Sequence, residues 1–367
     1  MTRCSALLVE TPPTCIALVT VMAAVTVIVC SPSLAAGTLT TPAASPLAPE
    51  VRNALVARAS TLPRLRSLLV SVDGEIVEEH YFNGASVSEL ANVKSVSKTI
   101  ISILVGIAID QGLLAGVEQP ITDFFGDELE EAGPAKRAIT LEDLLTMRSG
   151  LETTSNRNYG RWVHSPHWVR HVLSRPMVEE PRGPMIYSTG NTHLLSAIVT
   201  KASGVSTLTF GRRYLAEPLG ITLPDWLRDP QGIYFGGNEM QLTPRAMIEI
   251  GELYLRRGTV DGRELVSKEW IRASLVPRTQ SRYSHRHYGY GWWLRTVAGF
   301  STHYAWGYGG QFIFVIPDLD AVVVATSSPL PGEGRRTHRR DLDALIERQL
   351  IPEIARARTV KPLSRGL

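Results

Sequence analysis

Residues 91–114 read ANVKSVSKTIISILVGIAIDQGLL, and this stretch decides the fold class. Its second part, residues 99–114, is apolar on nearly every side, which is typical of a helix inside a protein core. Its first part places Ser95 and Lys98, in the order Ser-Val-Ser-Lys, directly before that helix. The stretch therefore predicts a buried helix that begins with a serine and a lysine three residues apart.

The spacing of Ser95 and Lys98 suits covalent catalysis. Residues three apart in the first helical turn share a face. A serine hydroxyl becomes a nucleophile when a base removes its proton, and a lysine can be that base when burial and the positive end of a helix lower its pKa. The backbone N–H of Ser95 would then face the developing oxyanion. Taken alone, the same residues also fit a helix cap followed by a solvated lysine.

Tyr187 is a second candidate. It lies in PMIYSTGN, residues 184–191, just before the helical pattern of residues 194–202. A tyrosine near a lysine can pass a proton to a leaving group. Alone, Tyr187 also fits a half-buried tyrosine in a turn.

A third candidate segment, WGYGGQ, occupies residues 306–311 and leads into a predicted strand. Its glycines allow a ligand to approach a strand edge closely, and a backbone N–H there can complete an oxyanion hole. The candidate substrate- or oxyanion-binding residues of the second and third segments are Thr189, Asn191, Trp306, Gly307, Gly309 and Gly310. The alternative for the third segment is an aromatic and glycine-rich strand corner.

Strand patterns stand at both ends of the chain and helical patterns fill the middle. Asp73-Gly74 between two alternating runs predicts a β-hairpin over residues 68–82. Further patterns predict helices near 139–145, 194–202, 244–257 and 341–354, and strands near 289–294, 311–316 and 321–326. We therefore predict an α+β fold, in which helices cover one antiparallel sheet built from both chain ends. A mostly helical lobe, about residues 110–280, is inserted into this domain of residues 61–355.

The N-terminus has the pattern of a secretory signal peptide. The apolar, uncharged run of residues 15–30 is followed by Pro32 and small residues, and cleavage is expected near Ala35 or Ala36. We expect a signal peptide at 1–36, a mobile leader at 37–60 and a tail at 356–367. The mature protein would be periplasmic or secreted. There are two alternatives. One is an uncleaved signal anchor, which is the only membrane contact that we expect. The other is a misassigned start codon.

The composition narrows the chemistry further. The three cysteines all lie within residues 1–36, so the predicted mature protein has no thiol. The formal net charge of +3 is too small to favour a nucleic-acid partner. His164, His167 and His171 lack a spaced carboxylate or fourth ligand, so we expect no metal and no cofactor. The basic run at Arg335, Arg336, Arg339 and Arg340 is interpreted as a solvated helix face, with an anion site as the alternative.

Taken together, the three segments resemble the serine hydrolases of the β-lactamase and penicillin-binding-protein superfamily. The likeness is greater to the class C β-lactamase-like branch, which includes esterases, D-amino-acid peptidases and 6-aminohexanoate-dimer hydrolases. It extends over about residues 68–350 and implies the β-lactamase/transpeptidase-like fold. It also implies that Ser95 is the acylated nucleophile, Lys98 the general base and Tyr187 the proton shuttle.

Two departures from this family bear on the substrate. The second family motif is often Tyr-x-Asn, whereas Thr189 stands third here and Asn191 follows two residues later. The third motif often begins with Lys or His, and residues 304–310 contain no cation, although His303 or Arg295 could substitute. The resemblance therefore favours a small ester or amide substrate, as in the aminohexanoate-hydrolase group.

The alternatives are a β-lactamase or D-alanyl-D-alanine peptidase, and a non-catalytic sensor that kept the fold. Selectivity is expected in loops such as residues 156–169 and 224–239. The oligomeric state stays open.

Overall fold

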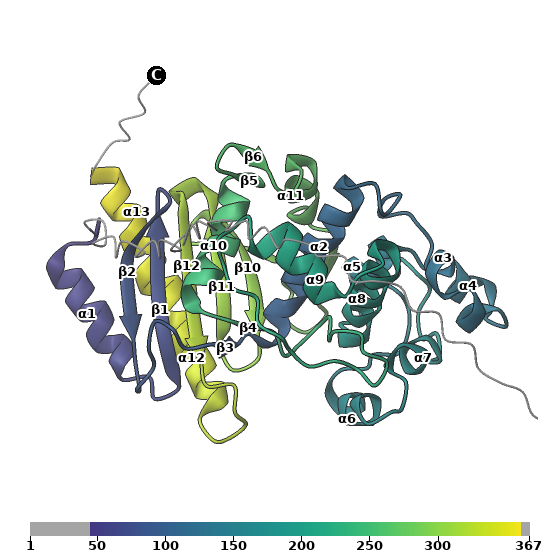
Figure 1. Cartoon of the computed structure of the whole chain (residues 1–367). Coiled ribbons are helices and arrows are strands. Elements are labelled where there is room, and N and C mark those ends of the chain that lie inside the picture. The colour runs from purple at the N-terminus through teal and green to yellow at the C-terminus, as the bar shows by residue number, and fades with distance from the viewer. Residues whose placement is uncertain (1–44, 361–367) are drawn as a thin grey trace, which may run out of the picture. The chain divides into compact units, whose positions relative to one another are not determined.

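The computed structural model describes residues 45–360, with side chains up to Arg358. One eight-stranded sheet forms its centre, in the order β2-β1-β12-β11-β10-β9-β8-β7. Figure 1 labels the strands from β2 to β10. Every neighbouring pair in this sheet is antiparallel. Its strands are β1 (Leu65–Val72), β2 (Glu75–Tyr81), β7 (Thr279–Gln280), β8 (His287–Tyr288), β9 (Trp293–Val297), β10 (Phe300–Gly307), β11 (Gln311–Ile316) and β12 (Ala321–Ser327). Strands from both ends of the described chain thus pair, which confirms the α+β prediction.

The predicted hairpin is present as β1 and β2. Asp73 and Gly74 join the two strands with φ angles of 54° and 84°. Two positive φ angles in a two-residue loop match the twist of the flanking strands. Two small antiparallel pairs lie outside the main sheet: β3 (Ala91–Asn92) with β4 (Gln241–Leu242), and β5 (Thr259–Val260) with β6 (Arg263–Glu264).

The helices and turns fill the rest of the described chain. The helices are α1 (Pro49–Ser60), α2 (Ser97–Asp110), α3 (Thr122–Phe125), α4 (Pro134–Arg137), α5 (Leu141–Leu145), α6 (Tyr159–Val163), α7 (Trp168–Leu173), α8 (Thr189–Ser203), α9 (Thr207–Gly211), α10 (Pro244–Leu255), α11 (Lys268–Ser274), α12 (Arg335–Leu345) and α13 (Ile351–Val360). Single helical turns are η1 (Lys94–Val96), η2 (Asp127–Leu129), η3 (Asn156–Asn158), η4 (Arg212–Ala216), η5 (Pro317–Leu319) and η6 (Ile346–Leu350).

Two apolar clusters cover the two faces of the central sheet. Alternation along β11 sends Phe312 and Phe314 to one cluster and Ile313 and Val315 to the other. The first cluster also holds buried residues of α1, α12 and α13, and the second holds those of α2 and α10. Helix α2 is buried all round from Ser97 to Ala108, as its apolar sequence predicts. The sheet and α2 therefore form a fixed frame around the start of α2.

Three predicted boundaries need correction. Residues 49–60, expected in a mobile leader, form α1, because Leu55 and Ala59 are buried in the cluster on the sheet. The last helix continues to residue 360, so the ordered chain passes the expected end at 355. Helix α10 falls within residues 110–280, yet it packs on β12, β11 and β1. Gly251 allows this contact, since an added Cβ would stand 2.4 Å from Val322.

The signal peptide prediction at 1–36, with Ala35 and Ala36, lies outside the described residues, as do residues 37–44 and 361–367. Within residues 45–360, none of the helices combines the length and apolar character that crossing a bilayer requires.

Candidate active site

Ser95 and Lys98 meet at the junction of η1 and α2. Lys98 lies in the first turn of α2, so its side chain returns toward η1 and places Nζ 3.0 Å from Ser95 Oγ. The Lys98 side chain is buried, with 1% of its surface exposed. Its Nζ also donates to the backbone carbonyl of Gly237 at 2.6 Å. The two residues that the spacing predicted to share a face therefore do so, and Lys98 is not a solvated lysine.

Burial lowers the pKa of Lys98 to about 7. An ammonium group loses hydration when it is buried, and this favours the neutral amine. A large fraction of Lys98 is therefore neutral near pH 7, and a neutral amine can accept the proton of the neighbouring hydroxyl.

Tyr187 lies directly before α8 and faces the same site. Its ring stacks on Trp293 with centroids 5.8 Å apart, and Lys98 Nζ stands 5.1 Å from its ring centroid. Burial raises the pKa of Tyr187 to about 12, and a hydrogen bond with Ser95 partly opposes this rise. Tyr187 therefore carries its proton at neutral pH. Tyr187 therefore lies together with Ser95 and Lys98, although it comes from a distant part of the sequence.

The glycine-rich third segment forms the end of β10 and the turn into β11. Strand β10 packs against η1. An added Cβ on Gly307 would stand 2.2 Å from the carbonyl oxygen of Val93, two residues before Ser95. Gly309 and Gly310 have φ angles of 92° and 109°, which favour glycine. The turn therefore needs glycine both for close approach and for its backbone conformation, and it lies beside the turn that carries Ser95.

Thr189 and Asn191 take different positions. Thr189 Oγ1 pairs with Ser155 Oγ at 2.9 Å, and 5% of the residue is exposed. Asn191 has no exposed surface, and its Oδ1 accepts a hydrogen bond from Ser149 Oγ at 3.2 Å. The prediction that Asn191 contacts substrate is therefore wrong for this structure. Asn191 points into the core because it lies two residues further along α8 than Thr189.

A cavity of about 420 Å³ lies next to Trp293, the residue on which Tyr187 stacks. It is lined by Ser284, Arg286, Trp293, Tyr304, Trp306 and Arg339. Trp293, which stacks on Tyr187, is also part of the cavity wall, so the cavity and the catalytic candidates share a side chain.

The cations of this cavity come from outside the third segment. Arg339 of α12 lies over the Trp306 ring at 4.3 Å, and Arg286 lies 5.5 Å from the Tyr304 ring centroid. Among residues 45–360, Arg339 forms an ion pair through Nε with Asp343, and no ion pair of Arg286 is found. The interpretation of the basic run as a solvated face is therefore wrong for Arg339. Arg335, one helical turn earlier, lies over the Tyr308 ring at 4.4 Å. The spacing of four residues between Arg335 and Arg339 was the sequence signal that both face the aromatic third segment.

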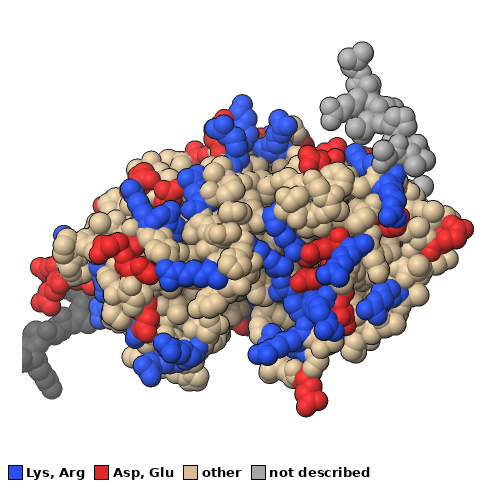
Figure 2. Space-filling model, turned by 180° about the vertical axis from the view of Figure 1, so that it is seen from behind, with Lys and Arg blue, Asp and Glu red and all other residues tan. Residues whose placement is uncertain are grey.

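The two substitutes suggested by the sequence do not supply a free cation. Burial lowers the pKa of His303 to about 4, so its ring is neutral at pH 7. Arg295 is paired with Glu347. On the face seen in Figure 2, basic and acidic side chains are interspersed, which agrees with the small net charge.

Sequence reasoning also missed the contacts of Asn92 and Lys94 with Glu239, just before Ser95, which we call the clamp. Lys94 Nζ forms an ion pair with Glu239 Oε1 at 2.8 Å, and Asn92 Nδ2 donates to Glu239 Oε2 at 2.5 Å. Lys94 and Glu239 both have positive φ, at 50° and 67°. Strained conformations of this kind persist where the surroundings enforce them. The clamp joins the turn of Ser95 to the segment that carries Gly237, which sequence reasoning identified only as part of a selectivity loop.

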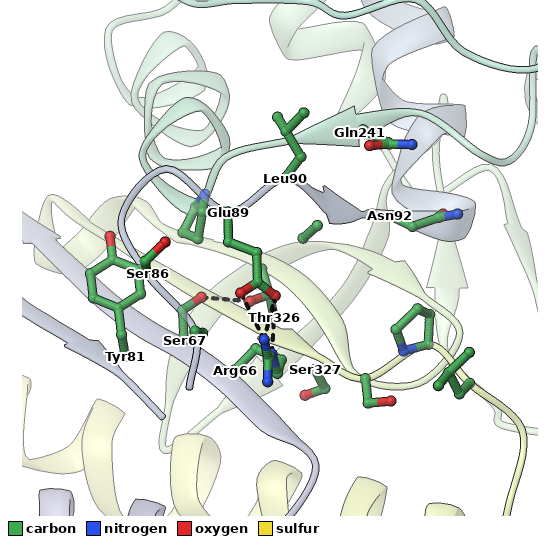
Figure 3. A pocket seen from close by; sticks show the side chains of 16 residues that line it. Arg66, Ser67, Tyr81, Ser86, Glu89, Leu90, Asn92, Gln241, Thr326 and Ser327 are labelled. Atoms are coloured by element: carbon green, nitrogen blue, oxygen red, sulfur yellow. Dashed lines mark hydrogen bonds and ion pairs between the residues drawn. The ribbon is translucent and has the colours of Figure 1, made fainter. Parts of the chain in front are cut away.

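A second cavity, of about 410 Å³, lies beside β3 and β4 (Figure 3). Its two charged side chains, Arg66 and Glu89, pair with each other at 2.7 Å, and Ser67 and Thr326 share a hydrogen bond of 2.6 Å. The charge in this cavity is therefore neutralised internally.

Within the part of the chain that the structure describes, no group of three or more His, Cys, Asp or Glu side chains is placed to hold a metal ion. His164 lies at the end of α6, and His167 caps α7 by accepting the N–H of Arg170 at 3.3 Å.

The chain is similar to known proteins over most of its length. The Beta-lactamase family profile matches residues 66–348. The 6-aminohexanoate-dimer hydrolase of Paenarthrobacter ureafaciens is 24% identical over 343 residues, which cover 83% of this chain and 84% of that protein.

Two solved structures share the fold. One is a protein of Bacillus anthracis described as a candidate 6-aminohexanoate-dimer hydrolase, with a TM-score of 0.69 and 16% identity over 86% of this chain and 83% of that one. The other is a penicillin-binding-protein homologue of Caulobacter crescentus, with a TM-score of 0.65 and 17% identity over 84% of this chain and 98% of that one. With the family profile matched over most of its length, the chain belongs to the beta-lactamase family of serine hydrolases.

Proposed function

We propose that this protein is an exported serine hydrolase that cleaves an amide or ester bond through an acyl intermediate on Ser95. The observation that carries the proposal is the 3.0 Å contact between Ser95 Oγ and Nζ of Lys98, a lysine whose pKa burial lowers to about 7. A buried amine that is neutral near pH 7 is a competent general base for a serine hydroxyl.

In the proposed first step, Lys98 takes the proton of Ser95 and Ser95 Oγ attacks the substrate carbonyl carbon. The backbone N–H groups of Ser95 and of the Gly309 region stabilise the negative charge on the carbonyl oxygen. The bond to the leaving group then breaks, and Tyr187 donates its proton to the leaving nitrogen or oxygen. The pKa of Tyr187, raised to about 12, supports a donor that holds its proton until this moment. Lys98 returns the first proton to Tyr187.

In the second step, water attacks the acyl carbon while Lys98 accepts its proton. The bond between Ser95 Oγ and the acyl carbon breaks, and Lys98 returns the proton it took from water to Ser95 Oγ. The products are a carboxylic acid and a free amine or alcohol.

The proposed substrate is a small linear amide or ester that carries a carboxylate, such as a short oligomer of an ω-amino acid. The guanidinium groups of Arg286 and Arg339 in the cavity beside Tyr187 support this class, because guanidinium groups bind carboxylates through charge-assisted hydrogen bonds. The name of the Paenarthrobacter ureafaciens relative points to the same chemistry.

Fluorophosphonate labelling with peptide mapping tests the nucleophile. We expect the adduct on Ser95, its loss in Ser95→Ala, and its retention in Ser97→Ala, which removes the other hydroxyl of the motif. An adduct elsewhere, or turnover by Ser95→Ala, would overturn the proposal.

A substrate panel tests the reaction. We expect turnover of aminohexanoate dimer and p-nitrophenyl esters. Nitrocefin or D-Ala-D-Ala peptide hydrolysed as fast as the esters would assign a β-lactamase or peptidase instead. Stoichiometric acylation without turnover would assign a sensor.

Export is tested on the protein as it matures. The apolar run at residues 15–30 and the small residues after it support a cleaved signal peptide. We expect the mature N-terminus at residue 36 or 37, in the periplasm or the medium. A mature chain that retains residues 15–30 would contradict cleavage.

A further inference from the structure

A short hairpin in the segment before Glu239 lies on one side of α8. The Phe235 N–H donates a backbone hydrogen bond to the Leu227 carbonyl at 2.9 Å, and the backbones of Arg228 and Tyr234 form an antiparallel β-bridge. Ser196 of α8 donates to the Tyr234 carbonyl at 2.7 Å. The residues of α8 that meet this segment are Thr189, Thr192, His193 and Ser196. Their spacing of three and four residues forms one stripe along the helix.

The centre of this contact is a buried pair, His193 and Asp229. His193 Nε2 lies 3.0 Å from Asp229 Oδ2, and neither side chain is exposed. Asp229 Oδ1 accepts the backbone N–H groups of Gln231 and Ile233, each at 2.9 Å. One carboxylate therefore closes the hairpin turn and ties it to α8. The imidazole is enclosed by the rings of Trp162, Trp168 and Phe235, whose centroids lie 5.4–5.9 Å from its own.

The hairpin leads directly to Gly237, whose carbonyl oxygen accepts a hydrogen bond from Lys98. An added Cβ on Gly236 would stand 2.1 Å from the Thr192 carbonyl oxygen, and one on Gly237 would stand 2.4 Å from Thr192 Oγ1. The backbone therefore rests directly on α8 at these two glycines. The next contact is the 2.6 Å bond from Lys98 Nζ to the Gly237 carbonyl.

We propose that His193 and Asp229 form a positioning pair, which holds the hairpin on α8 so that the Gly237 backbone covers Lys98 and excludes water from it. This inference rests on the proposed role of Lys98 as general base. Burial of a titratable pair is costly unless its polar atoms are satisfied. Here the backbone groups that shape the hairpin satisfy the Asp229 carboxylate, whereas His193 Nδ1 has no hydrogen-bond partner among the described residues, so the bond to Asp229 is the one that holds the ring.

The surroundings of each group are simple. Among the described residues, the side chains in contact with Lys98 Nζ are those of Ser95 and Tyr187, and burial is the cause of its lowered pKa. The groups around His193 and Asp229 are aromatic rings and backbone amides. A change in the pH dependence of Ser95 reactivity therefore reports on the cover over Lys98.

The test measures the rate of Ser95 labelling by a fluorophosphonate between pH 5.5 and 10. The wild-type rate is expected to rise with pH, with a midpoint near the pKa of Lys98, about 7. His193→Phe keeps a ring among the aromatic neighbours and removes the bond to Asp229. We expect its midpoint to move to higher pH by about one unit or more, because water then reaches Lys98. Labelling falls about fivefold at pH 7 and recovers near pH 10.

Two further variants isolate the hydrogen bond. His193→Gln retains an N–H donor toward Asp229 and is expected to keep the wild-type midpoint. Arg228→Ala removes an exposed ion pair with Asp225 in the same hairpin and is also expected to keep it. If His193→Phe does not fold, His193→Leu decides, since it also removes the bond to Asp229 and is expected to shift the midpoint upward.

The outcomes separate the inference from the proposed function. A wild-type midpoint near 7 that His193→Phe or His193→Leu leaves in place would overturn the inference alone, even if the variant is less stable. A wild-type rate without a midpoint near neutral pH would instead contradict the role of Lys98.

Discussion

Replacing Lys98 by Met should change how the stability of the protein depends on pH. The folded protein holds Lys98 with a pKa of about 7, because burial disfavours the ammonium form. In the unfolded chain a lysine has a pKa of about 10.4. Between these two values the unfolded chain binds one proton more than the folded protein, so the free energy of unfolding rises with pH. Lys98→Met removes this contribution and leaves the other titrating groups in place.

The size of the effect follows from the two pKa values. The contribution of one proton is about 1.4 kcal/mol per pH unit. Integrated from pH 7.5 to 9.5, the stability of the wild type should rise by about 2.5 kcal/mol relative to Lys98→Met. Below about pH 6 the two curves should run parallel, since the lysine is then protonated in both states.

Urea unfolding at 25 °C, followed by tryptophan fluorescence at the two pH values, measures this double difference. Lys98→Arg is a useful companion, because a guanidinium group stays charged throughout this range and should show no such rise. A double difference below about 0.5 kcal/mol would refute the reasoning, since it would give Lys98 the pKa of a solvated lysine.

Three other substitutions test separate parts of the site. Tyr187→Phe should lower kcat for an amide about 100-fold or more while a fluorophosphonate still labels Ser95; an unchanged kcat would remove Tyr187 from leaving-group protonation. Arg339→Ala should raise KM about tenfold for a carboxylate-bearing amide and leave KM for a neutral p-nitrophenyl ester within about twofold; equal effects on both substrates in steady-state assays would contradict a carboxylate site. Gly307→Ala should abolish labelling and lower the melting temperature by about 2 °C or more, because its Cβ would stand 2.2 Å from the Val93 carbonyl oxygen; wild-type labelling and melting would contradict the close approach.

The sheet and the helix of Lys98 could be predicted because their patterns are local. The two-residue Asp73-Gly74 turn specifies a hairpin, and the continuous apolar run after Lys98 specifies a buried helix. Helix α1 was missed because the segment before it, rich in Thr, Pro and Ala, resembles a linker. Only Leu55 and Ala59 of α1 are buried, which is too few to stand out from the sequence.

The catalytic candidates could be predicted from the sequence. The residues that surround them in the folded protein, such as Gly237 and Arg339, could not. Ser95 and Lys98 are three residues apart, so helical geometry alone brings them together. Gly237 and Arg339 reach the site from segments more than 130 residues away, through a hairpin resting on α8 and a helix packed on the sheet. Asn191 was misplaced because a motif gives the order of residues and not the side of the helix that each one faces.

The central claim is that Ser95 carries the acyl group during turnover. Acid quenching of the enzyme while it hydrolyses a p-nitrophenyl ester, followed by mass spectrometry of its peptides, tests this most directly. The account predicts the mass of the acyl group on the peptide that contains Ser95, and its accumulation in a variant with slow deacylation. Full turnover with no acylated peptide, or with the acyl group on another residue, would contradict it.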